Sequence, residues 1–162
     1  MLQIGFSEWN NGFDSRRDRA IINIAQGGKF IIKGMAYFGI GSIINIGSKG
    51  EFHVGDNFSC NANCHFEICN RVNIGKNVLI SWNCNFIDSN FHLFNNCKRY
   101  GTINIGDDCW ICCNSTILMN ATINKNTVVA ANSLVNKKFT DENILIAGAP
   151  AIIKNYNITW KV

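Results

Sequence analysis

Proline and charge are scarce in this 162-residue sequence, which contains one proline and in which charged residues make up 16% of the total. Scarce proline suits a chain whose backbone N–H groups are used in strand pairing throughout, because proline lacks that donor. No stretch approaches the ~20 consecutive apolar residues of a membrane-spanning helix. An apolar fraction of 47% excludes general disorder. At this length we expect one domain, residues 1–162.

Targeting and nucleic-acid signals are also lacking. The net charge is only +4, and basic residues other than Arg16, Arg17 and Arg19 are scattered, without the interleaved aromatic residues typical of nucleic-acid binding. The N-terminal segment places its basic residues after a short apolar run, the reverse of the order in a signal peptide. We therefore expect no nucleic-acid partner, no membrane span and a cytoplasmic location.

Cysteine, in contrast, is abundant, with eight residues. In the absence of a signal peptide, the redox environment favours free thiols over disulfides. The segment "CWICC" (109–113) contains closely spaced cysteines, but no second Cys/His pair with zinc-finger spacing accompanies it. We therefore expect no metal site and interpret the cysteines as small apolar fillers.

A six-residue repeat runs through the second half of the chain. Its first position is always a branched aliphatic residue: Ile105, Ile111, Ile117, Ile123, Val129 and Val135. Its fifth position is small until a final aromatic residue: Cys109, Ser115, Ala121, Thr127, Ser133 and Phe139. A period of six matches neither a helix nor one long strand, and it indicates short strands and turns stacked as a solenoid. Asn and Gly between the strands tolerate the left-handed backbone of tight corners.

The pattern is weaker towards the N-terminus. Hexads led by Val54, Cys60 and Phe66 slip by two positions before the hexads led by Ile74 and Ile80. Residues 21–40 alternate like early strands, and residues 1–20 are predicted to be an irregular lead-in.

The repeat stops at "FIDSNFHLFNNCKRYG" (86–101), where Asp88 and His92 occur. A solenoid face is flat and offers no pocket, so functional residues are expected on an ejected loop. We predict such a loop at about residues 88–101.

Five segments in order, "NANCHFE", "ISWNCNFIDSNFH", "IGDDCWICCNSTI", "AANSLVNKK" and "AGAPA", resemble the hexapeptide-repeat acyltransferase family. Within it they resemble sugar O-acetyltransferases of the maltose, galactoside and surface-polysaccharide type, over roughly residues 40–155. The resemblance implies an all-β left-handed parallel β-helix, although the usual crossover rule favours the opposite hand. It also implies a homotrimer with active sites between subunits, and acetyl-CoA as cosubstrate without a metal.

The resemblance assigns three candidate catalytic residues. His92 would be the general base that takes the proton of a sugar hydroxyl, and an imidazole titrating near neutrality suits that task. Asp88, four residues upstream, would orient the imidazole through a hydrogen bond, or would only cap the turn. Asn63 would contact the acceptor or donate a hydrogen bond to the developing oxyanion, or would be a corner residue without a catalytic part.

The cofactor residues are also implied by the resemblance. They are Trp110 at the cofactor or acceptor wall, Cys113, Ala131 and Asn136 along the groove, Lys137 near the nucleotide, and the turn residues Gly148 and Pro150. Residues 140–162 would form the C-terminal cofactor end. The chain departs from the family pattern at Ile152, where a basic residue is common, and Lys154 would replace it.

The predicted function is therefore transfer of an acetyl group from acetyl-CoA to a sugar hydroxyl in surface glycan biosynthesis. The alternatives are an N-acetyltransferase acting on an amino-sugar nucleotide and a non-catalytic structural solenoid. A γ-type carbonic anhydrase would need three histidines converging on zinc. It is disfavoured because His53, His65 and His92 are 12 and 27 residues apart.

Overall fold

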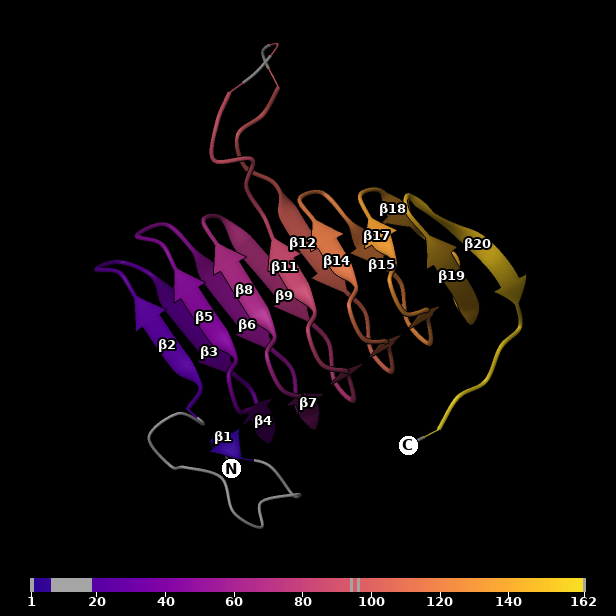
Figure 1. Ribbon diagram of the computed structural model, residues 1–162, viewed down its shortest axis with the longest axis horizontal. Coiled ribbons are helices and arrows are strands. Elements are labelled where there is room, and N and C mark those ends of the chain that lie inside the picture. Colours follow the sequence, from indigo (N-terminus) through magenta and orange to yellow (C-terminus); the bar gives the residue numbers. More distant parts are fainter. Residues whose placement is uncertain (1, 7–18, 94, 96, 162) are drawn as a thin grey trace.

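The computed structural model describes residues 2–6, 19–93, 95 and 97–161. Within this part every regular element is a β-strand, and the strands form three sheets that run along one solenoid axis (Figure 1). Successive strands pass from one sheet to the next, so that each group of three makes one coil. All strand pairs are parallel except the last. The predicted β-helix is thus present. No helix in the described part is long and apolar enough to cross a membrane.

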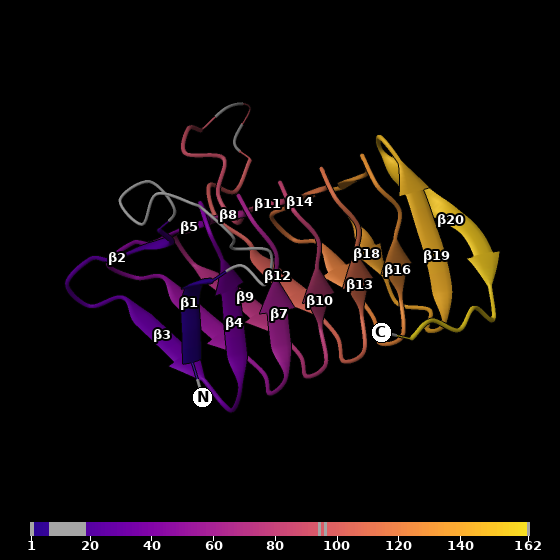
Figure 2. The same cartoon turned by 60° about the horizontal axis from the view of Figure 1, so that its bottom comes forward.

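We call the three sheets A, B and C. Sheet A, seen face on in Figure 2, contains β1 (Leu2–Phe6), β4 (Ala36–Gly39), β7 (Phe58–Cys60), β10 (Leu79–Ile80), β13 (Trp110–Ile111), β16 (Val128–Val129), β19 (Ile144–Gly148) and β20 (Ala151–Tyr156). Sheet B contains β2 (Ile21–Ile24), β5 (Ile43–Ile46), β8 (His65–Ile68), β11 (Asn85–Ile87), β14 (Thr116–Leu118) and β17 (Leu134–Val135). Sheet C contains β3 (Lys29–Ile32), β6 (Glu51–Val54), β9 (Arg71–Ile74), β12 (Thr102–Ile105), β15 (Thr122–Ile123) and β18 (Lys138–Phe139).

The N-terminal part is more regular than the sequence indicated. The solenoid begins at β2, and β1 pairs in parallel with β4, so the prediction of an irregular lead-in is wrong for Leu2–Phe6. Residues 7–18 of that lead-in lie outside the described part. Coil lengths explain the weak periodicity. Paired positions in sheet B lie 22 residues apart from Ile21 to Ile43 and from Ile43 to His65, 20 from His65 to Asn85, and 18 from Thr116 to Leu134. Only 18 is three hexads, and the 20-residue coil accounts for the slip of two.

The hexad positions form the core as predicted. All six aliphatic first positions from Ile105 to Val135 and all six fifth positions from Cys109 to Phe139 are buried. The fifth-position hydroxyls bond to backbone carbonyls nearby, with Ser133 Oγ donating to the Ala130 oxygen at 2.6 Å. The earlier coils are filled by stacked phenylalanines, and the rings of Phe66 and Phe86 lie 4.7 Å apart at an interplanar angle of 6°.

The corners confirm the role expected for asparagine. Thirteen non-glycine residues have positive φ, and eleven of them are asparagines. At the corner between sheets C and A these side chains stack from coil to coil. Asn57 Nδ2 donates to Asn77 Oδ1 at 3.0 Å, and Asn77 Nδ2 donates to Asp108 Oδ1 at 2.8 Å. The corner therefore combines a backbone conformation that asparagine tolerates with a ladder of amide hydrogen bonds.

The predicted loop leaves the solenoid at the corner between sheets B and C. β11 ends at Ile87 and β12 begins at Thr102, and the intervening residues project away from the coils (Figure 1). Strand pairing with the preceding coil continues on both sides, through β11 with β8 and β12 with β9. The loop is therefore an insertion at one corner that leaves the coil intact.

Candidate active site

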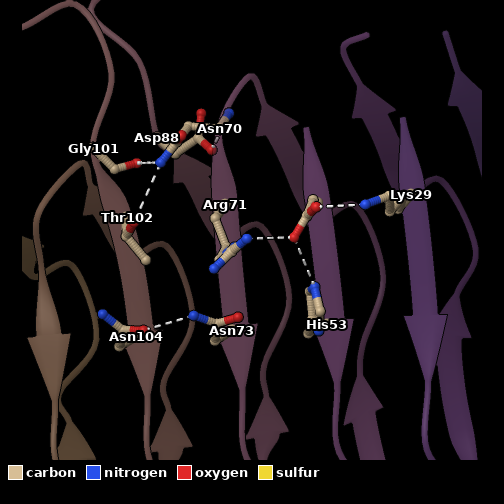
Figure 3. A network of polar contacts seen from close by, with 10 residues as sticks. Lys29, His53, Asn70, Arg71, Asn73, Asp88, Gly101, Thr102 and Asn104 are labelled. Carbon is tan, nitrogen blue, oxygen red and sulfur yellow. Dashed lines mark hydrogen bonds and ion pairs between the residues drawn. The ribbon is translucent and has the colours of Figure 1, made fainter. Parts of the chain in front are cut away.

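Asp88 lies at the base of the loop and is fully buried. Its carboxylate accepts hydrogen bonds from the backbone N–H groups of Cys69 at 2.7 Å and Asn70 at 2.8 Å, in the preceding coil (Figure 3). Burial raises the pKa of Asp88, because desolvation disfavours the ionised form more than these amides favour it. The expected hydrogen bond between Asp88 and His92 is not among the contacts of the described residues. Both carboxylate oxygens face backbone amides, so this geometry favours the capping interpretation.

The two arms of the loop pair just above this base. Gly101 N–H donates to the Asp88 oxygen at 2.9 Å, and Asn90 N–H donates to the Arg99 oxygen at 2.9 Å. Ser89 and Tyr100 form an antiparallel bridge between these two bonds. The arms therefore leave the solenoid as a short two-stranded ribbon.

His92 follows this ribbon directly. Phe91, the residue before it, has a φ of +56°, a backbone conformation that is strained for a bulky side chain. Two bonds hold the turn: Phe91 N–H donates to Ser89 Oγ at 2.9 Å, and His92 N–H donates to the Asn90 oxygen at 2.5 Å. The His92 side chain is exposed and makes no hydrogen bond or ion pair with other described residues. The loop thus presents an accessible imidazole at a fixed point of its backbone.

A groove of about 430 Å³ runs between the loop and the outer surface of sheet B. Its lining combines an apolar floor with amides and one cation, from Ile87, Ser89, Asn90, Cys97, Lys98, Leu118, Met119, Asn120 and Asn136. Asn136, one of the expected cofactor residues, therefore shares a groove with the active-site loop.

Asn63 lies elsewhere, at the corner between sheets A and B. Its φ is +59°, and its N–H donates to the Ile40 oxygen of the preceding coil at 2.9 Å. Asn83, Asn114 and Asn132 occupy the same corner in later coils, with φ between +58° and +59°. Asn63 is thus a corner residue by its backbone. Within one chain the full width of sheet B separates it from the loop.

The other expected cofactor residues divide between two corners. Cys113, Ala131, Gly148 and Pro150 follow β13, β16 and β19 and lie at the corner between sheets A and B. Asn136 and Lys137 follow β17 at the next corner, where the Lys137 ammonium lies 5.3 Å from the centre of the Phe139 ring. The Lys154 side chain is exposed on β20. One chain therefore does not gather this set at a single point.

Trp110 lies on the outer face of sheet A and is partly covered. Its indole N–H donates to Ser81 Oγ at 3.1 Å, and its ring packs against Trp160 of the C-terminal segment, with centroids 5.9 Å apart. Trp160 in turn donates its N–H to the Asp108 oxygen at 2.8 Å. Both indole donors are satisfied, so any ligand contact would use the remaining ring surface.

The histidines and cysteines form no metal-binding group among the described residues. His53 and His65 lie on different sheets, C and B, and each pairs with a glutamate of its own strand. All eight cysteines are free thiols, and Cys64, Cys84 and Cys109 are buried at corners as the repeat predicted.

Asn70 is the site residue that the sequence analysis missed. Its N–H binds Asp88, while its side-chain amide donates to the Gly101 oxygen at 3.1 Å and to Thr102 Oγ1 at 3.2 Å. In the sequence it resembles any corner asparagine. The available signal is its distance of 18 residues from Asp88, about one coil.

Sequence comparisons relate the chain to bacterial surface-glycan proteins. An uncharacterised 24.8 kDa protein in the cps region of Klebsiella pneumoniae is 33% identical over 144 residues, covering 74% of this chain and 65% of that protein. WbbJ of Escherichia coli K12, named as a lipopolysaccharide biosynthesis O-acetyl transferase, is 31% identical over 139 residues, covering 76% of this chain and 70% of WbbJ. The chain thus spans about two thirds of the length of these curated relatives. No family model matches it.

Solved structures agree with these relatives. A galactoside acetyltransferase in complex with coenzyme A superposes with a TM-score of 0.64 and 25% identity, covering 80% of this chain and 64% of that one. The hexapeptide-repeat acetyltransferase VCA0836 from Vibrio cholerae, complexed with acetyl-CoA, gives 0.63 and 26%, covering 78% and 70%. The fold and the loop define a left-handed β-helix of the acetyltransferase type. The chain belongs to the hexapeptide-repeat acetyltransferase family.

Proposed function

We propose that the protein transfers an acetyl group from acetyl-CoA to a sugar hydroxyl, in the cytoplasm, as a step in surface glycan biosynthesis. The observation that carries this proposal is the ejected loop, which presents the exposed His92 beside a groove that also contains Asn136. The relative WbbJ is named for O-acetyl transfer in lipopolysaccharide biosynthesis, which supports the choice of reaction and pathway.

In this reaction His92 acts as the general base. Its imidazole accepts the proton of the acceptor hydroxyl while the hydroxyl oxygen forms a bond to the thioester carbonyl carbon. When the carbon–sulfur bond breaks, the protonated imidazole returns this proton to the departing sulfur. His92 suits both steps because its side chain is open to solvent and its backbone is fixed.

Acetyl-CoA supplies the activated acetyl group, and residues of two corners would hold it. The corner containing Cys113, Ala131 and Gly148 offers exposed or half-exposed backbone for the amides of the pantetheine arm. The exposed ammonium groups of Lys137 and Lys154 suit the phosphates. Ile152 offers no charge for this purpose.

We further propose that the protein acts as a homotrimer. Asn63 and His92 belong to different corners of the coil, so they can form one site only if they come from different chains. A site between subunits would also bring together the two groups of cofactor residues that one chain keeps apart.

The test is an acetyl-CoA consumption assay against a panel of neutral sugars, acidic sugars and amino-sugar nucleotides, with mass analysis of the products. We expect acetyl esters that are cleaved by mild base. Base-stable amides on the amino-sugar nucleotides would instead identify an N-acetyltransferase. If coenzyme A does not bind and no acceptor is modified, the protein would be a non-catalytic solenoid.

A further inference from the structure

The loop is fastened to the solenoid at one place, and this fastening involves both ends of the loop. Asp88, at the start, binds the N–H groups of Cys69 and Asn70, and the side chain of Asn70 binds Gly101 and Thr102 at the end (Figure 3). We propose that Asp88 and Asn70 form a clasp that positions His92, and that Asp88 is a positioning residue rather than the hydrogen-bond partner of the imidazole. This inference rests on the proposed role of His92.

Other corners show which part of this arrangement is ordinary. Asp56 and Asp107 each use one carboxylate oxygen to bind a backbone N–H of the preceding coil, from Met35 at 2.6 Å and from Lys76 at 2.9 Å. Both lie at the corner between sheets C and A, and neither is buried. Asp88 is fully buried and uses both oxygens, at the corner that carries the loop.

Burying a carboxylate is unfavourable unless it is well bonded. Asp88 forms no ion pair within the described part of the chain, and Glu67, on the neighbouring strand β8, adds a second negative charge. The two backbone amides of the Cys69–Asn70 corner are therefore its main compensation. Because the carboxylate depends on that corner, the loop that begins with Asp88 is tied to the same corner.

The other end of the loop is fixed just as closely. A Cβ atom on Gly101 would collide with the side-chain amide of Asn120 in the following coil. Gly101 therefore permits the returning chain to lie against the next coil while it bonds to Asp88 and Asn70. The clasp thus joins three successive coils at the base of the loop.

From the clasp to His92 the chain is continuously bonded. The Gly101–Asp88 and Asn90–Arg99 backbone bonds lead to the turn at Phe91, which ends at the His92 N–H. A shift at the clasp would move this ribbon and the imidazole with it. Misplacement of a catalytic group by about 1 Å can lower the rate about 100-fold.

The test compares Asp88→Asn and Asn70→Ala with Asn73→Ala as a matched control. Asn73 lies on β9 and donates to Asn104 Oδ1 at 2.8 Å, on the same strand pair, but it does not touch the loop. In Asp88→Asn, an NH₂ group would face a backbone N–H that needs an acceptor. Trypsin cleavage after Lys98 and Arg99 reports opening of the loop without requiring activity.

We expect both clasp variants to be cleaved in the loop roughly tenfold or more faster than the wild-type protein. We also expect kcat to fall about 10- to 100-fold with little change in the KM for acetyl-CoA. The imidazole pKa of His92, followed by NMR and assigned with His92→Ala, should stay within about 0.3 of the wild-type value. Asn73→Ala should match the wild-type protein in all three measurements.

A lowered pKa of His92 in Asp88→Asn, with unchanged cleavage, would overturn the clasp and restore the orienting carboxylate. Unchanged cleavage in both clasp variants would also overturn it. If Asp88→Asn does not fold, Asn70→Ala still decides, since it leaves the buried carboxylate and its two amides in place. Accelerated cleavage in a protein with no acetyl transfer would support the clasp and reject the proposed function.

Discussion

His92 is the residue at which activity and folding should separate. Replacing it with Ala removes the proposed base, and loss of a general base typically lowers the rate about 10²–10⁴-fold. The free energy of unfolding should change by no more than about 0.5 kcal/mol, because the side chain is exposed and has no bonded partner among the described residues. Steady-state kinetics, urea unfolding and coenzyme A calorimetry on one preparation measure all three quantities.

His53→Ala is the matched control, since that histidine lies on β6 and bonds to Glu51. It should retain full acetyl transfer. Full activity in His92→Ala would exclude this histidine as the base, whereas loss of folding would show that it is structural.

The cysteines should differ sharply in reactivity, although all are free. Burial raises the pKa of Cys109 to about 12 and that of Cys112 to about 11, so little reactive thiolate forms at pH 8. Cys97 is exposed on the loop. With a thiol reagent such as DTNB, we expect one fast phase in the native protein that disappears in Cys97→Ser, and eight thiols after denaturation. Fewer than eight would reveal a disulfide.

Asp88 and Asn63 show how far single residues could be interpreted from the sequence. Their positions, on the loop and at a corner, were predicted correctly. Their contacts were not, because a carboxylate near a histidine and a carboxylate facing two amides look alike in the sequence. Only the coil stacking, which brings residues 18 and 19 positions apart into contact, distinguishes the two.

At the scale of elements, the outer face of sheet C carries a ladder of charges across three strands. Glu51 on β6 bonds to Lys29 at 2.9 Å and to Arg71 at 2.6 Å, and His53 lies 3.3 Å away (Figure 3). The hydrogen bonds from Lys29 and then His53 are the main causes that lower the pKa of Glu51 to about 2. A lowered carboxyl pKa stabilises the fold above the unfolded value of about 4.5, and this contribution is lost as the pH falls towards 2.

Replacing Glu51 with Gln should therefore lower stability at pH 7 and have less effect at pH 3. The ladder is on the surface, so 1 M salt should shrink the difference at pH 7. Urea unfolding of both proteins at the two pH values and two salt concentrations measures this. An equal deficit under all conditions would mean that Glu51 contributes through packing instead of charge.

The elements themselves were predictable where the coil length is a multiple of six. In the later coils, from Ile105 onward, the hexads located every inward position. In the first coils the period is 22 residues, which spreads the extra residues over the corners and hides the repeat. β1 could not be foreseen, because its pairing with β4 depends on a partner more than 30 positions away.

At the scale of the whole molecule, the protein should be a trimer in solution. Light scattering after size exclusion should give about three times the 18.1 kDa of one chain. Mixing His92→Ala with Asn63→Ala should then restore part of the activity, because some mixed trimers combine a wild-type loop with a wild-type Asn63 corner. A monomer at micromolar concentration would contradict the proposed assembly, and a trimer without complementation would place Asn63 outside the site.

The corner that carries the loop has a consequence for how such a chain can diversify. The equivalent corner one coil earlier takes only Cys69 and Asn70 to pass from β8 to β9, whereas residues 88–101 make the same passage here. The pairing of β11 and β12 with their neighbours does not depend on which length is used. The loop is thus an exchangeable cassette. Acceptor choice could change by swapping these fourteen residues between relatives while the coils, and the cofactor corners on them, stay as they are.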